Sequence, residues 1–244
     1  MSLLITCEFA GKQIPDGLPQ MDHLVESGHF VEDRPNPAKW KSDAVSLHIG
    51  RLLSQQLTAP LLFNPYSSQL IDVTKSLGHP KLFTERTRDW PPESKQFLIN
   101  EVHSAYRERV RRAIRHLTIH FSPVIHLSLR TFPLKLGDRI RRTDVGLLYD
   151  SARDWEADFC ADWVDELYWM CPNLKVRRNY PRRGTVDSLT KAMRGEFPAE
   201  EYLGIDVWFN RAWVARPLQI REDCLLTICR SLAMLTRQMA VEAA

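Results

Sequence analysis

Short segments rich in valine, isoleucine and leucine alternate along this chain with longer segments of helical periodicity. This alternation is typical of a mostly parallel sheet that helices cover on both faces. The pattern predicts seven strands, at residues 3–7, 60–63, 69–73, 124–129, 145–149, 174–178 and 202–209. We therefore expect an α/β fold with three layers, in which the sheet is the middle layer.

Four longer segments repeat their apolar side chains every three or four residues and are predicted to be helices. They lie at residues 43–57, 93–120, 152–170 and 217–241, and Ser42 or Asp43 is the expected N-cap of the first. Loops rich in proline or glycine are expected at residues 33–37, 64–68, 131–142 and 179–185. No repeat, low-complexity segment or Gly/Ser linker divides the sequence, so we expect one domain over residues 1–244.

The composition excludes several classes of protein. With 44% hydrophobic and 26% charged residues, the chain is in the ordinary globular range. No segment approaches the ~18 consecutive apolar residues of a membrane-spanning helix, and the first residues contain no basic region, so we expect a cytoplasmic protein. The net charge of +3 is too small to indicate nucleic-acid binding. The five cysteines include no Cys-x-x-Cys pair and are expected to be free thiols.

Two strand ends carry candidate site residues. Glu8 follows the first strand, where a carboxylate can ligate a metal or act as a general base. From these residues alone, a surface turn carboxylate is the favoured interpretation. Alternation along the strand at 124–129 places His126, Ser128 and Arg130 on one face, with Arg130 at the carboxyl end. For His126, a hydrogen-bonded histidine inside the sheet is favoured over a metal ligand.

Arginines cluster in two loops. Arg139, Arg141 and Arg142 precede one predicted strand, and Arg177, Arg178, Arg182 and Arg183 surround the next loop. Guanidinium groups match carboxylates and phosphates, so two such loops meeting at one sheet edge would form an anion pocket. Solvated loop charges are the alternative, and the sequence does not decide between them. The arginines of residues 107–116 are interpreted as the solvated face of a helix.

An ordered series of short motifs runs through nearly the whole chain. The motifs are CEFAG at 7–11 with IP at 14–15, LIDV at 70–73, SLGHP at 76–80, HLS at 126–128, TF at 131–132, Arg141 with DVGLLYD at 144–150, RRNYP at 177–181, RG at 183–184, LT at 189–190 and YLGI at 202–205. In this order they resemble the N-formylglutamate amidohydrolase family.

The resemblance implies a phosphorylase/hydrolase-like α/β fold with a mixed sheet and the metal-dependent hydrolysis of an N-acyl amino acid such as N-formylglutamate. A metal would polarise the amide and activate water, and a carboxylate would move protons. By resemblance, Glu8 and Asp206 are the candidate catalytic carboxylates. The candidate substrate-binding residues are Arg130, Arg141, Arg183, Asn179 and Lys75.

This sequence departs from the family at the metal-binding positions. Phe9 and Arg130 stand where the family has histidine, and Asp206 and Trp208 stand where it has two glutamates. Phenylalanine offers no lone pair, and a guanidinium repels a divalent cation. We therefore expect no metal, unless zinc or another divalent ion is bound with a repositioned histidine, namely His48, His79 or His103.

Two functions remain open on the sequence. One is an amide hydrolase of this family with an altered site. The other is a non-catalytic binding or regulatory protein that holds a small carboxylate or phosphate ligand in an arginine-lined pocket. The clusters of basic residues would suit nucleic-acid binding, but the sequence contains no recognised nucleic-acid-binding module. Trp208 and Trp213 are expected either to fill the pocket or to lie in the core, where large aromatic residues usually lie.

Overall fold

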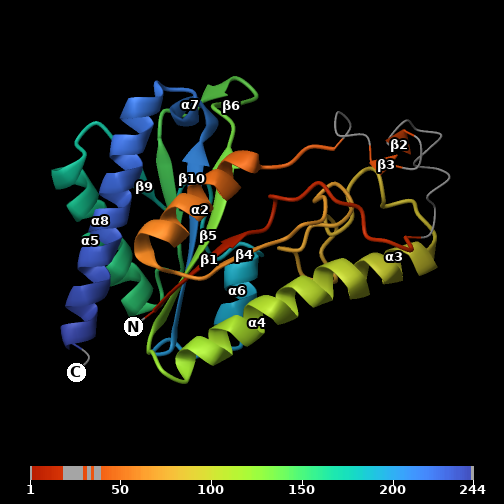
Figure 1. The fold of residues 1–244 in the computed structure, drawn as a ribbon, viewed down its shortest axis with the longest axis horizontal. Helices are drawn as coiled ribbons and strands as arrows, with labels where there is room; N and C mark the ends of the chain where they lie inside the picture. The colour runs from red at the N-terminus through yellow and green to blue at the C-terminus, as the bar shows by residue number, and fades with distance from the viewer. Residues whose placement is uncertain (1, 19–29, 32–33, 36–39, 243–244) are drawn as a thin grey trace.

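The computed structural model describes residues 2–18, 30–31, 34–35 and 40–242 and shows a six-stranded sheet between two layers of helices (Figure 1). The strand order is β4-β1-β5-β10-β8-β9. The strands are β1 (Ser2–Cys7), β4 (Leu61–Phe63), β5 (Val124–Phe132), β10 (Tyr202–Asn210), β8 (Val145–Leu148) and β9 (Val176–Arg178). The three-layer α/β fold expected from the sequence is confirmed.

The sheet is mixed because the chain reverses direction between β10 and β8. Neighbouring strands from β4 to β10 are parallel, β8 is antiparallel to β10, and β9 is parallel to β8. Strands β8 and β9 therefore begin at the edge of the sheet where β1, β5 and β10 end. This edge gathers the loop after β5, the segment before β8 and the segment before β9.

One face of the sheet is covered by α2 (Ala44–Leu57), α5 (Asp154–Met170) and α8 (Leu218–Glu242) (Figure 1). Their apolar side chains form one core with alternate strand residues such as Ile5, Leu127 and Ile205. The N-cap of α2 is Asp43, whose Oδ1 accepts a hydrogen bond from the Ser46 amide at 3.1 Å.

The other face is covered by a long helix and by α6 (Leu189–Arg194). The long helix consists of α3 (Pro92–Leu98), a π-helical turn η1 (Ile99–Ser104) and α4 (Ala105–Thr118). Thus the helix predicted at residues 93–120 is present. Its cationic face is less solvated than predicted, because Arg107 donates to the Lys75 carbonyl at 3.0 Å and Arg111 pairs with Glu196.

The strand predicted at residues 69–73 is wrong. This segment is a turn in which Ile71 makes an isolated bridge to Phe83. Leu70, Ile71 and Val73 are apolar because they lie in the core under the long helix, and burial in a loop produces the same apolar run as a buried strand.

The remaining elements are short and lie outside the main sheet. They are β2 (Phe30–Val31) paired with β3 (Arg34–Pro35), β6 (Lys135–Leu136) paired with β7 (Arg139–Ile140), and α7 (Arg211–Val214). The predicted loop at 131–142 therefore contains a hairpin, and its first two residues belong to β5. Residues 33, 36 and 37 of the loop predicted at 33–37 lie outside the described residues.

The cysteine and membrane predictions can be compared directly with the structure. All five cysteines are free thiols, as expected. No helix in the described part of the chain combines the length and apolar composition needed to cross a bilayer.

A buried ion pair joins three elements behind the sheet edge. Arg194 Nε of α6 lies 2.9 Å from Glu156 Oε1 of α5, and both side chains are almost fully buried. Glu156 Oε1 also accepts from the Gly204 amide of β10 at 2.9 Å, and Arg194 Nη1 donates to the Gly184 carbonyl at 2.9 Å. Removal of one charge would leave the other buried without its partner.

We therefore predict that Arg194→Met lowers the free energy of unfolding by about 3–5 kcal/mol, as breaking one side of a buried pair does. Lys191 lies on the same helix but is exposed, so Lys191→Met is the control. It should change the free energy of unfolding by less than about 0.5 kcal/mol. Urea denaturation of both variants measures the difference. Equal stabilities would contradict the structural role given to the pair.

Candidate functional site

Alternate residues of three adjacent strands present polar side chains to one face of the sheet. Thr6 of β1 and Asp206 of β10 are both in register with Ser128 of β5. One step nearer the carboxyl edge, Arg130 is in register with Trp208. The prediction that His126, Ser128 and Arg130 share a face is confirmed, since Leu127 and Leu129 lie in the opposite core.

Phe9, Arg130 and Trp208, which differ from the residues of the amidohydrolase pattern, form a single stack at this edge. The Cζ atom of Arg130 lies 3.8 Å from the centre of the Phe9 ring and 4.9 Å from that of Trp208. The Cζ atom of Arg182 lies 4.7 Å from the centre of the Trp208 ring. Two aromatic rings and two guanidinium groups thus alternate, an arrangement that cation–π attraction stabilises. Trp208 is a wall of the site, whereas Trp213 lies in the core.

The side chain of Arg130 makes no hydrogen bond or ion pair with another described residue, although the rings of Phe9 and Trp208 lie against its guanidinium. Burial lowers the pKa of Arg130, and Asp72 opposes this effect while Arg182 adds to it. A guanidinium still remains charged at any ordinary pH. Its N–H donors are therefore available to an anion or to water in the adjoining pocket.

A directed chain of hydrogen bonds lies beneath the stack. The Thr6 hydroxyl donates to Glu8 Oε1, so it accepts from His126 Nε2, which is 2.8 Å away. His126 Nδ1 then accepts from the Tyr202 hydroxyl at 2.7 Å. Burial, together with the charge of Arg194, lowers the pKa of His126 to about 3, which keeps the imidazole neutral as this pattern requires. The favoured interpretation of His126 as a histidine bonded inside the sheet is confirmed.

Glu8 lies at the end of this chain. It is 1% exposed, and the Ser128 hydroxyl donates to its Oε2 at 3.0 Å. Burial raises the pKa of Glu8 to about 7, and the nearby charge of Asp206 adds to this, while the Thr6 and Ser128 hydroxyls oppose it. The interpretation of Glu8 as a surface turn carboxylate, favoured on the sequence, is therefore wrong. Asp206 is also buried, which raises its pKa, and its Oδ2 accepts from the Thr190 hydroxyl at 3.0 Å.

A pocket of about 350 Å³ opens beside the stack. Its lining includes the cations Lys41, Arg130, Arg141 and Arg211 and the single carboxylate of Asp43. Asp43 Oδ2 is occupied by the amide and hydroxyl of Thr131, at 2.7 and 2.9 Å. Phe9 and Trp208 line the pocket, whereas neither Glu8 nor Asp206 does. The pocket therefore presents cations and not a catalytic carboxylate.

The structure brings only some of the predicted binding residues to this pocket. Arg130 and Arg141 line it. Lys75 is buried beside it, donating from Nζ to the Asp187 carbonyl at 2.8 Å, and burial followed by the charge of Arg182 lowers its pKa. Asn179 has φ 49° and holds its own loop, since its Oδ1 accepts from the Tyr149 and Gly184 amides at 3.2 and 2.9 Å. Arg183 is exposed and is not part of the lining.

Arg182 takes the place near the stack that was expected for its neighbour Arg183. The loop after β9 folds back over β8, where Gly146 allows the Tyr180 carbonyl to approach. A Cβ at Gly146 would lie 1.8 Å from that oxygen, and a Cβ at Gly184 would lie 2.2 Å from the Tyr149 amide nitrogen. The two glycines indicate a close backbone approach, but the sequence does not show which arginine then faces Trp208.

The donors at this edge do not fit the metal implied by the resemblance. Within the described residues, no group of three or more His, Cys, Asp and Glu side chains is placed to hold an ion. His48 is exposed, His79 Nδ1 accepts from the Lys81 amide at 3.0 Å, and His103 Nε2 bonds the Lys75 carbonyl at 2.7 Å. The Arg130 guanidinium instead places a positive charge near Glu8, and this charge would repel a divalent cation.

The architecture is that of an α/β protein with a mostly parallel mixed sheet, and two solved structures share it over almost their whole length. The gene product Atu2144 from Agrobacterium tumefaciens has a TM-score of 0.71 and 19% identity, covering 99% of this chain and 92% of its own. An N-formylglutamate amidohydrolase from Ralstonia eutropha JMP134 has a TM-score of 0.61 and 16% identity, covering 97% and 95%. No family model and no curated protein sequence matches the chain. At these identities the likeness establishes the fold.

The pKa of Glu8 leads to a prediction about stability. The folded chain keeps the Glu8 proton up to about pH 7, whereas the ordinary value is 4.5. Between these values the folded state binds more protons than the unfolded state, so this group makes stability fall as pH rises. Between pH 5 and pH 8, this group should lower the free energy of unfolding of the parent protein by up to ~2–3 kcal/mol. Glu8→Gln should abolish this loss.

Denaturation at both pH values measures this change, with the exposed Glu93→Gln as the matched control. The Glu8→Gln variant should equal or exceed the parent protein in stability at pH 8. If its stability depends on pH as the parent's does, Glu8 is not the buried, proton-retaining group described above.

Proposed function

We propose that this chain uses an amidohydrolase-like fold to bind a small anionic ligand, a carboxylate or a phosphate, without hydrolysing it. The observation that carries the proposal is the Arg130 guanidinium, which contacts Phe9 and Trp208 and makes no hydrogen bond or ion pair with a described carboxylate, although the charges of Asp72, Asp43 and Glu8 favour its charged form. Its planar N–H fork matches a carboxylate or a phosphate with two parallel hydrogen bonds.

The surroundings of Arg130 favour an anion over water as the occupant of the pocket. Four cationic side chains line it against one carboxylate, and that carboxylate already accepts three hydrogen bonds. Arg141 lies over the Phe132 ring at 5.8 Å, and Arg211 Nε donates to the Thr131 hydroxyl at 3.0 Å. Among these cations Arg130 is the one that is strongly desolvated, so the attraction of an anion should be strongest there.

Metal-dependent hydrolysis of an N-formyl amino acid is the second candidate function. It is supported by the likeness to the Ralstonia amidohydrolase and by the raised pKa of Glu8, a value suited to proton transfer near neutral pH. It is opposed by the geometry, since Glu8 does not line the pocket and both of its oxygens already accept hydrogen bonds, from the Thr6 and Ser128 hydroxyls. A general base must reach the proton that it removes.

Calorimetric titration with N-formyl-L-glutamate, succinate and inorganic phosphate tests the proposal. We expect saturable binding of at least one of these ligands and no release of formate from N-formylglutamate. Arg130→Met should weaken the binding by roughly 10–100-fold, the effect of losing a charge-assisted hydrogen-bond pair. Arg112→Met, an exposed helix arginine, is the control and should leave the affinity unchanged.

Formate release that a chelator abolishes would refute the non-catalytic function. Unchanged affinity in Arg130→Met, or the absence of saturable binding for all three probes, would refute the ligand site.

A second variant tests why the metal is excluded. In Phe9→His combined with Arg130→His, two imidazoles would stand beside the Glu8 carboxylate, and three such donors suit zinc. We expect the double variant to bind zinc at least ~10-fold more tightly than the parent protein, a gain of about 1.4 kcal/mol. Phe9→His alone, which keeps the Arg130 cation, should gain little affinity for zinc. A folded double variant without zinc would show that Trp208 or Asp206 also blocks the site.

A further inference from the structure

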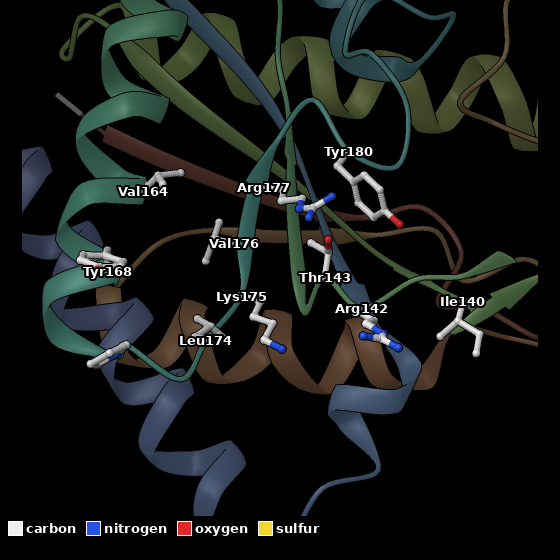
Figure 2. A pocket seen from close by; sticks show the side chains of 11 residues that line it. Ile140, Arg142, Thr143, Val164, Tyr168, Leu174, Lys175, Val176, Arg177 and Tyr180 are labelled. Atoms are coloured by element: carbon white, nitrogen blue, oxygen red, sulfur yellow. The ribbon is translucent and has the colours of Figure 1, made fainter.

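A second and larger pocket lies at the open edge of the sheet, outside the site described above (Figure 2). It has a volume of about 610 Å³, within the range of ordinary small-molecule sites. It lies between α5, the segment before β8 and the edge strand β9, and none of its lining residues lines the first pocket.

The lining of this pocket combines an apolar floor with a cationic rim. Val164 and Tyr168 from α5 and Leu174 and Val176 from the β9 region supply apolar surface. The charged residues of the lining are Arg142, Lys175 and Arg177, and the lining includes no carboxylate. Figure 2 shows the three cationic side chains around Thr143, with the Arg177 guanidinium on the side of the Tyr180 ring.

The three cations have no ion pair with any described residue. Asp144 is the neighbouring carboxylate in the sequence, and both of its oxygens are already engaged. Its Oδ1 accepts from Arg216 Nη2 at 2.9 Å and its Oδ2 from the Lys175 backbone amide at 2.9 Å. The Lys175 ammonium and the two guanidinium groups belong to exposed residues and are open to solvent and to an external anion.

The reversal of the sheet explains why two cationic pockets lie side by side. Because β8 and β9 begin where β5 and β10 end, Arg141 and Arg142 reach opposite sides of one short segment. Tyr180 divides the two sides, since it lines the second pocket and stands against Phe132 of the first at 6.0 Å between ring centres. The two arginine loops thus meet at one edge but supply two separate sites.

We propose that this pocket is a second ligand site, which binds an amphipathic anion consisting of an aromatic group and a phosphate or carboxylate group. The charged group contacts Arg142, Lys175 and Arg177, and the aromatic group lies on Tyr168 and Val176. The stack of Arg177 on Tyr180, at 5.7 Å, fixes one cation at the boundary between floor and rim. Inorganic phosphate would leave the apolar floor of the pocket exposed to water, and a neutral aromatic molecule would leave its cations without an anionic partner.

An acidic peptide that adds a strand along the free edge of β9 is an alternative ligand, because its carboxylates could pair with the same cationic side chains. That strand has only three residues, so it offers very few main-chain hydrogen bonds to an added strand. A partly open pocket of about 610 Å³ therefore favours a compact ligand.

The test is a fluorescence or calorimetric titration of the full chain with phenyl phosphate and with 3-phenylpropionate. We expect saturable binding of at least one, with inorganic phosphate and phenol each at least ~10-fold weaker. Arg142→Ala combined with Lys175→Ala should weaken the binding at least ~10-fold. Lys81→Ala combined with Arg112→Ala removes the same charge at exposed positions and should not change it.

Arg130→Met separates this proposal from the first site, because it should leave phenyl phosphate binding at the second pocket unchanged. The proposal is overturned if neither aromatic anion binds, if the Arg142 and Lys175 variant binds as the parent does, or if Arg130→Met abolishes the binding. It is also overturned if an acidic hexapeptide binds more tightly than both aromatic anions.

Discussion

The cation–π contact of Arg130 with Phe9 and Trp208 determines the character of the whole sheet edge. A guanidinium cannot lose its charge at ordinary pH, so a positive centre is fixed at the position beside Glu8. The aromatic faces hold it in place without neutralising it, as a carboxylate partner would. From this one contact follow the poor fit for a divalent ion and the availability of N–H donors for an anion.

Glu8 is buried near the same contact. Its loss of hydration outweighs the hydrogen bonds from the Thr6 and Ser128 hydroxyls, so that its pKa rises to about 7. The donors Tyr202, His126 and Thr6 all point along one direction, toward Glu8. Glu8 is thus a buried carboxyl group that accepts directed hydrogen bonds and does not line the pocket.

Sequence patterns predicted the features that depend on local periodicity. Alternation placed Arg130 on the face of His126, and the strand boundaries located the edge where the polar side chains gather. The segment at 69–73 was mistaken for a strand because an apolar run reports burial and not hydrogen bonding. The contact of Arg182 with Trp208 depends on how the loop after β9 crosses Gly146, a long-range approach that no local pattern encodes.

The fold and the candidate site depend on different polar interactions. Glu156 and Arg194 join α5, α6 and β10, and Asp144 joins Arg216 to the segment before β9. Neither pair contacts the stack. A substitution at position 9 or 130 should therefore leave these anchoring interactions intact, because sites without shared contacts affect stability nearly independently. The ion pairs that anchor the fold and the cation–π stack of the candidate site are thus physically separate.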